Sequence, residues 1–146
     1  MKALKTLFIA LEAGLLLTGC TKEYYVPDTP MIKYDYDVRS SQWQLFGDCY
    51  CATLDVPAIT RSVVTNGNVQ VSRCYPGDNN GIDVWTPLPM MRVEVAEGTG
   101  GGDYYYTTYI DYEWTAGTVN IFVTMSDLYT GDVPGDMSFR VFITEQ

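Results

Sequence analysis

The chain of 146 residues contains no histidine, and its nine lysine and arginine residues are outnumbered by eighteen aspartate and glutamate residues. Without histidine it lacks the most frequent general base and zinc ligand, and every Ser-His-Asp arrangement is excluded. The shortage of positive charge excludes binding to nucleic acid through the phosphate backbone, which needs clustered lysine and arginine. We therefore expect a protein without catalytic activity, metal, cofactor or nucleic-acid partner.

Apolar segments long enough to span a membrane are also missing. The longest apolar run, residues 7–17, is interrupted by Glu12 and falls short of the roughly 20 residues that cross a bilayer core. Lys2 and Lys5 precede this run, and small residues follow it, which is the order of an export signal. The sequence therefore predicts an exported protein with no spanning helix.

The signal ends in Leu17-Thr18-Gly19-Cys20, and this motif resembles the lipobox of bacterial lipoproteins. The resemblance implies that residues 1–19 are removed and that Cys20 becomes the acylated N-terminus, so the lipid makes the membrane a partner. In such lipoproteins a residue other than aspartate after the cysteine, here Thr21, implies delivery to the outer membrane. Thr21-Lys22-Glu23 has a single acid, which leaves both the periplasmic and the surface face open.

The rest of the chain divides into a tether and one domain. Residues 20–33 contain Pro27 and Pro30 and no apolar periodicity, which indicates a short extended tether. Residues 34–146 are enough for a single domain. Without its signal the chain keeps seven basic and seventeen acidic residues, a net charge of −10, and we interpret this charge as a source of solubility.

The domain shows strand patterns and no extended helical periodicity. Apolar and polar residues alternate with period two, as half-buried strands require. The pattern predicts an antiparallel β-sandwich of about seven to eight strands, with a small up-and-down β-barrel as the alternative. The predicted inward-facing rows are Tyr34/Tyr36/Val38, Trp43/Leu45, Tyr50/Ala52/Leu54/Val56, Val69/Val71, Val119/Ile121/Val123 and Phe139/Val141/Ile143.

Three segments carry more specific local signals. Residues 59–66 lack alternation and indicate one helical turn, followed by a turn at Asn66-Gly67. Residues 85–89 hold two prolines, which cannot donate in a central strand, so we expect this segment to cross between layers or to cover an edge. Residues 104–114 and 118–125 form the clearest hairpin, because Gly117 can adopt the positive φ of its turn.

Eight short segments, spread over nearly all of the domain, carry a family resemblance. They are Trp43-Gln44-Leu45, residues 52–60, residues 66–69, residues 85–89, Asp111-Tyr112, residues 117–119, residues 123–127 and residues 139–141. In this order they resemble a family of uncharacterised β-sandwich lipoproteins from Bacteroidota. The family resemblance supports the fold and the envelope location, and it implies no activity.

Three cysteines remain after Cys20. Cys49 and Cys51 are two apart on a predicted strand and share a face, so they cannot readily bridge to each other. Because an exported protein meets an oxidising compartment, we expect a disulfide from Cys74 to Cys49 or Cys51 if their strands are neighbours, with free thiols as the alternative.

The sequence leaves two kinds of binding role open. Tyr104, Tyr105 and Tyr106 precede the clearest hairpin, and alternation places at least one of them outward, so they form the candidate binding surface. An envelope protein of this kind would serve as a non-catalytic binding or assembly module with a protein partner. The alternative is a carbohydrate-binding module that uses exposed tyrosine or tryptophan. Residues 78–83 resemble a calcium loop weakly, and we interpret them as a turn.

Overall fold

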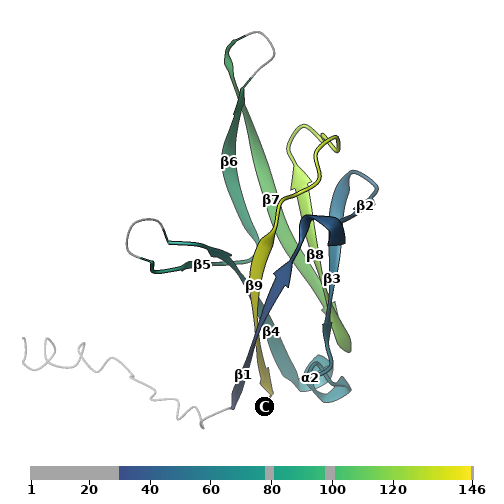
Figure 1. Cartoon of the computed structure of the whole chain (residues 1–146). Coiled ribbons are helices and arrows are strands. Elements are labelled where there is room, and N and C mark those ends of the chain that lie inside the picture. Colours follow the sequence, from purple (N-terminus) through teal and green to yellow (C-terminus); the bar gives the residue numbers. More distant parts are fainter. Residues whose placement is uncertain (1–29, 78–80, 98–100, 146) are drawn as a thin grey trace, which may run out of the picture.

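The computed structural model describes residues 30–77, 81–97 and 101–145, and these residues form two antiparallel sheets (Figure 1). One sheet has four strands in the order β1-β9-β4-β5, and the other has five in the order β2-β3-β8-β7-β6. The predicted β-sandwich is therefore confirmed. Both sheets stay open, so the barrel alternative is wrong.

The strands are longer and more numerous than the sequence indicates. The four-stranded sheet contains β1 (Met31–Val38), β9 (Met137–Glu145), β4 (Gly67–Tyr75) and β5 (Val84–Pro87). The five-stranded sheet contains β2 (Gln44–Phe46), β3 (Cys49–Val56), β8 (Gly117–Met125), β7 (Asp103–Thr115) and β6 (Met90–Glu97). β1 begins at Met31, inside the segment assigned to the tether, because residues 31–33 already pair with β9.

The core lies between the two sheets and is built from the predicted alternating rows. On β3 and β8 every second side chain is buried, and β9 contributes Phe139, Val141 and Ile143, each at most 1% exposed. Burying one such side chain contributes roughly 1.5–3 kcal/mol. Tyr34 and Leu45 depart from their predictions and are 39% and 58% exposed, because β1 and the three-residue β2 are edge strands of their sheets.

The predicted helical turn is α2 (Arg61–Asn66), which closes one end of the sandwich. The Thr60 side chain accepts a hydrogen bond from the Val63 N–H, and Val63 is buried. Asn66-Gly67 leads directly from this helix into β4. Among the described residues no helix is long and apolar enough to cross a membrane.

Residues 85–89 both cover an edge and cross between layers, as their prolines predict. β5 is the outer strand of the four-stranded sheet, and the chain then passes through Leu88 and Pro89 into β6 of the other sheet. Leu88 is buried, and its N–H donates to the Val71 carbonyl at 2.8 Å. The crossing is therefore part of the packed structure.

The outer face of the four-stranded sheet carries a charged cluster. Arg140 on β9 donates two hydrogen bonds to the Asp35 carboxylate on β1, at 2.7 and 3.0 Å. Its guanidinium also lies 3.7 Å from the centre of the Trp85 ring on β5. One cation thus connects both edge strands of this sheet to its interior.

The hairpin turn between β7 and β8 provides a first test. Gly117 has φ +83°, a region that residues with a Cβ rarely adopt, although a Cβ would meet no atom within 4 Å. We expect Gly117→Ala to lower the free energy of unfolding by about 1–2 kcal/mol through backbone strain alone. Gly135→Ala is the matched control, because that site is equally open and has ordinary φ. Equal urea midpoints for the two variants would contradict this explanation.

The Asp35–Arg140 pair provides a second test. The hydrogen bond from Arg140 holds the pKa of Asp35 below its ordinary value near 4. Because the folded-state pKa is the lower one, this pair stabilises the fold above pH 4 and the effect is lost as pH falls below it. We expect Asp35→Asn to lower the urea midpoint at pH 6, and the difference from the unaltered protein to shrink by pH 3. A difference that stays constant down to pH 3 would exclude this linkage.

Candidate functional site

The three tyrosines of the candidate surface lie near the start of β7 and point to both faces of the strand. Tyr105 lies on the outer side and is 63% exposed. Tyr104 and Tyr106 share the opposite side, where their rings are nearly parallel at 18° with centroids 6.3 Å apart. The structure therefore brings Tyr104 and Tyr106 together and separates Tyr105 from them.

A mismatch in strand length explains why Tyr104 and Tyr106 are not buried. They are in phase with Thr108 and Ile110, which are buried between the sheets. β7 has thirteen residues, and the β6–β7 hairpin extends beyond the end of the four-stranded sheet (Figure 1). The core-facing side of this hairpin thus continues past the strands that would cover it.

The connection between β8 and β9 covers this side in part and leaves a pocket of about 260 Å³. The Tyr104 hydroxyl donates to Asp127 at 2.9 Å, and the Tyr129 N–H donates to the other oxygen of the same carboxylate at 3.1 Å. We call this site the tyrosine pocket. Its lining residues are Ala96, Tyr104, Tyr106, Met125, Asp127, Tyr129 and Asp132.

These hydrogen bonds keep Asp127 charged. The backbone N–H of Tyr129 and then the Tyr104 hydroxyl lower the pKa of this carboxyl group. Between Asp127 and Tyr129, Leu128 has φ +57°, which is unusual for a residue other than glycine. The turn therefore presents a fixed anionic group beside the tyrosine rings.

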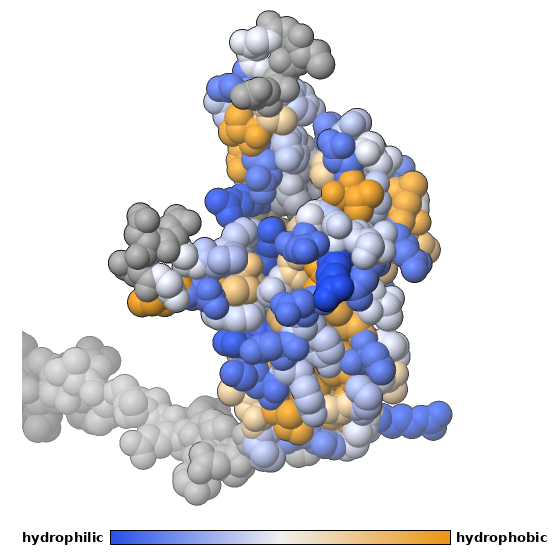
Figure 2. Space-filling view, viewed as in Figure 1, coloured by the Kyte–Doolittle hydropathy of each residue, from blue (hydrophilic) through white to orange (hydrophobic). Residues whose placement is uncertain are grey.

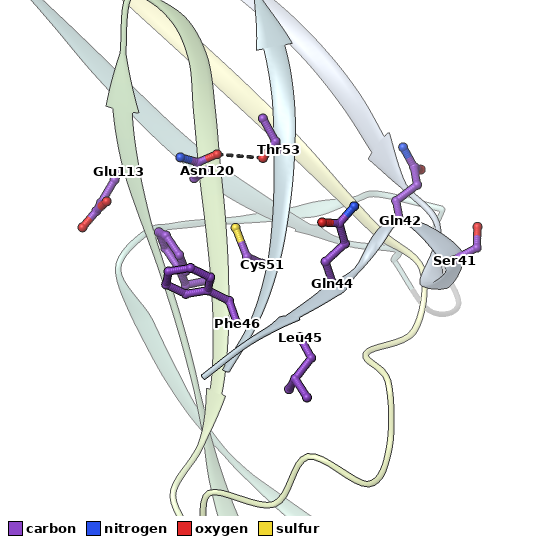
Figure 3. Close-up of a pocket in the computed structure, with 10 residues that line it drawn as sticks. Ser41, Gln42, Gln44, Leu45, Phe46, Cys51, Thr53, Glu113 and Asn120 are labelled. Atoms are coloured by element: carbon purple, nitrogen blue, oxygen red, sulfur yellow. Dashed lines mark hydrogen bonds between the residues drawn. The ribbon is translucent and has the colours of Figure 1, made fainter. Parts of the chain in front are cut away.

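A second hollow lies on the outer face of the five-stranded sheet, beside β2 (Figure 3). It has a volume of about 740 Å³ and is formed by β2, β3, β7, β8 and the short 3-10 turn η2 (Ser40–Gln42). We call this site the outer groove. Its lining residues are Ser41, Gln42, Gln44, Leu45, Phe46, Cys51, Thr53, Glu113, Asn120 and Phe122.

The outer groove combines amide groups with aromatic rings. Phe46 and Phe122 lie 6.5 Å apart between ring centres and are inclined by 52°. Thr53 donates to the Asn120 side-chain oxygen at 2.8 Å, which leaves the Asn120 NH₂ group as a donor (Figure 3). Donors, acceptors and apolar rings therefore coexist in one open site.

The expected disulfide does not form in this structure, because the cysteines lie on different sheets. Cys49 and Cys51 are on β3 of the five-stranded sheet, and Cys74 is on β4 of the other. All three side chains are out of phase with the core rows, and all three thiols are free. Burial raises the pKa of each thiol, which keeps it protonated and weakly nucleophilic near neutral pH.

Exposed apolar side chains gather in separate groups. Figure 2 shows orange groups over the β6–β7 hairpin, around β2 and near the start of β1, set among hydrophilic residues. The edge strand β6 alone exposes Met91, Val93 and Val95 to 72%, 63% and 57%. Such a row on an unpaired edge is uncommon on a monomeric surface.

A comparison of the chain with family models, curated proteins and solved structures finds no match.

The lipidation site and the calcium-like loop are not placed by the structure. Residues 1–29, including the signal and Cys20, lie outside the described residues, as do residues 78–80 of the loop. Within the described residues, no three histidine, cysteine, aspartate or glutamate side chains are grouped so that they could hold a metal ion.

Sequence reasoning missed the outer groove entirely, and of the seven described lining residues of the tyrosine pocket it named only Tyr104 and Tyr106. Asp127, Tyr129 and Asp132 belong to a segment whose glycines and prolines indicate a loop, and spacing gives no sign that it folds back onto Tyr104. The groove joins two segments, residues 41–53 and residues 113–122, that are far apart in the chain. The one available signal was the amide-rich segment Gln42–Gln44 beside Phe46.

Proposed function

We propose that this protein is a lipid-anchored component of the cell envelope, at the outer membrane, that acts as a non-catalytic binding or assembly module. The observation that carries the proposal is that the start of β1 and the tyrosine pocket lie at opposite ends of the sandwich. β1 begins at one end, beside the last residues of β9, and the β6–β7 hairpin, which contributes Tyr104 and Tyr106 to the tyrosine pocket, extends from the opposite end (Figure 1). A lipid on Cys20 would therefore present the pocket away from the membrane.

Binding rather than catalysis is supported by the carboxylates in the two sites. Glycoside hydrolysis by the usual route needs two facing carboxyl groups, one of them an acid with a raised pKa. The described lining of the outer groove holds one carboxylate, Glu113. In the tyrosine pocket the pKa of Asp127 is lowered, which suits a charged hydrogen-bond acceptor. The exposed apolar row on β6 supports an assembly role in addition.

Carbohydrate is the ligand class that best fits the outer groove, as a second candidate function. Gln42, Gln44 and Asn120 each offer both a donor and an acceptor, which neutral hydroxyl groups require. Phe46 is 68% exposed and presents an apolar ring to a sugar face. The sequence predicted exposed tyrosine or tryptophan for this purpose, and we propose phenylalanine and amide side chains instead.

Acylation of Cys20 tests the anchor. We expect the protein expressed in its bacterial host to incorporate labelled palmitate, to lose residues 1–19 and to fractionate with membranes. Cys20→Ala should abolish the label and release the protein, whereas Cys74→Ala should change neither. Intact-mass measurement of a product that still begins with Met1 and carries no acyl group would overturn the proposal.

A glycan array tests the outer groove, with the acylated protein in detergent as the probe. We expect Phe46→Ala to weaken the binding of any glycan recognised by the unaltered protein about five- to tenfold, through the loss of one stacking surface. Tyr105→Ala is the matched control, because this ring is similarly exposed and lies outside the groove. An unaltered protein that binds no glycan, or equal losses in both variants, would rule out the groove as a sugar site.

A further inference from the structure

The tyrosine pocket presents acceptors and ring faces, and none of its described lining side chains is basic. Tyr104, Tyr106 and Tyr129 contribute aromatic surface, and Asp127 and Asp132 contribute carboxylates. The Tyr104 hydroxyl proton is already directed to Asp127. Ring faces and carboxylates both attract positive charge, whereas a neutral sugar also needs donors, which the amide groups supply in the outer groove.

Two other clusters in the same chain show that aromatic rings, in one case together with a carboxylate, hold a cation. On the four-stranded sheet the Arg140 guanidinium lies 3.7 Å from the centre of the Trp85 ring and donates two hydrogen bonds to the Asp35 carboxylate. At the end of β4, the guanidinium groups of Arg73 and Arg92 lie 4.3 and 4.9 Å from the centre of the Tyr75 ring. In each cluster a cation of the chain itself covers the aromatic face.

The tyrosine pocket repeats the components of the Asp35–Arg140–Trp85 cluster without the cation. Its lining carries two carboxylates and three rings, and each basic side chain of the other two clusters lies outside that lining. The cation must therefore come from another molecule if the site is to be neutralised. A volume of about 260 Å³ suits a compact head group.

We propose that the tyrosine pocket binds a compact organic cation of the alkylammonium or guanidinium type. The aromatic surface of Tyr104 and Tyr106 and the carboxylates of Asp127 and Asp132 would hold this cation together. Such a cation is presented by a lysine or arginine side chain of a protein partner and also by a small free amine. The recognition chemistry is the same for both sources. The proposal depends neither on the outer groove nor on acylation of Cys20.

Titration of the acylated protein in detergent, followed by calorimetry and tyrosine fluorescence, tests this proposal. The probes are choline, N-acetyl-arginine amide, a short arginine-containing peptide, and 3,3-dimethylbutanol as the uncharged counterpart of choline. We expect the cations to bind with a Kd of about 1 mM or tighter, more weakly at high salt, and the alcohol not to bind. Tighter binding of the peptide than of choline would assign the natural cation to a protein partner, and the reverse order to a free amine.

Variants locate the site. Asp132→Asn and Tyr106→Leu should each weaken cation binding about three- to tenfold. Gly131→Ala should weaken it without removing any lining side chain, because a Cβ there meets the Tyr129 ring and must displace it. Tyr105→Leu is the control, since Tyr105 lies on the other side of β7 and its loss should leave affinity unchanged.

Circular dichroism melting of each variant separates a loss of binding from a loss of folding. If Tyr106→Leu melts early, the milder Tyr106→Phe replaces it, with a smaller expected loss of cation affinity. Equal binding of choline and its uncharged counterpart would overturn the proposal. So would the absence of cation binding at ~10 mM, or a loss in Tyr105→Leu as large as that in Tyr106→Leu.

Discussion

Burial of alternate side chains between two open sheets is the constraint on which this structure depends. The rows from β3, β8, β4 and β9 supply most of the fully buried side chains, and a strand that pairs in register must present its apolar residues to the facing sheet. Both candidate binding sites lie where strands of the five-stranded sheet lack a full set of neighbouring or facing strands. β7 outruns the four-stranded sheet and produces the tyrosine pocket, while the three-residue β2 leaves the outer groove open beside it.

Scarcity of positive charge gives the arginines a strong influence on the surface. Arg73, Arg92 and Arg140 all lie on aromatic rings, and Arg140 also joins β9 to β1 through Asp35. These cations are engaged within the chain, so a carboxylate elsewhere has few basic neighbours. The acidic balance is thus a source of solubility and also the reason that Asp127 and Asp132 can attract a cation from outside.

The limits of sequence reasoning follow from the range over which each signal acts. Alternation acts between near neighbours, so it predicted Val119, Ile121 and Val123 opposite Ile110 and Tyr112 correctly. It cannot say which strands are adjacent, and for this reason the pairing of Cys74 with Cys49 or Cys51 was expected across two strands that belong to different sheets. Alternation also failed to predict the exposure of Leu45, because that exposure depends on the position of β2 at a sheet edge.

By itself the sequence determined the all-β class, the hairpin at Gly117, the helical turn before β4 and the edge position of residues 85–89. Each of these depends on a local property: period two, positive φ, end-capping by Thr60, or the missing N–H of proline. The tertiary structure alone decided that Tyr104 bonds to Asp127 in a pocket shared with Tyr106, and that Gln44 and Phe46 line one groove with Asn120. These contacts join segments more than twenty residues apart, and the relative lengths of strands in opposite layers, which no local pattern encodes, bring them together.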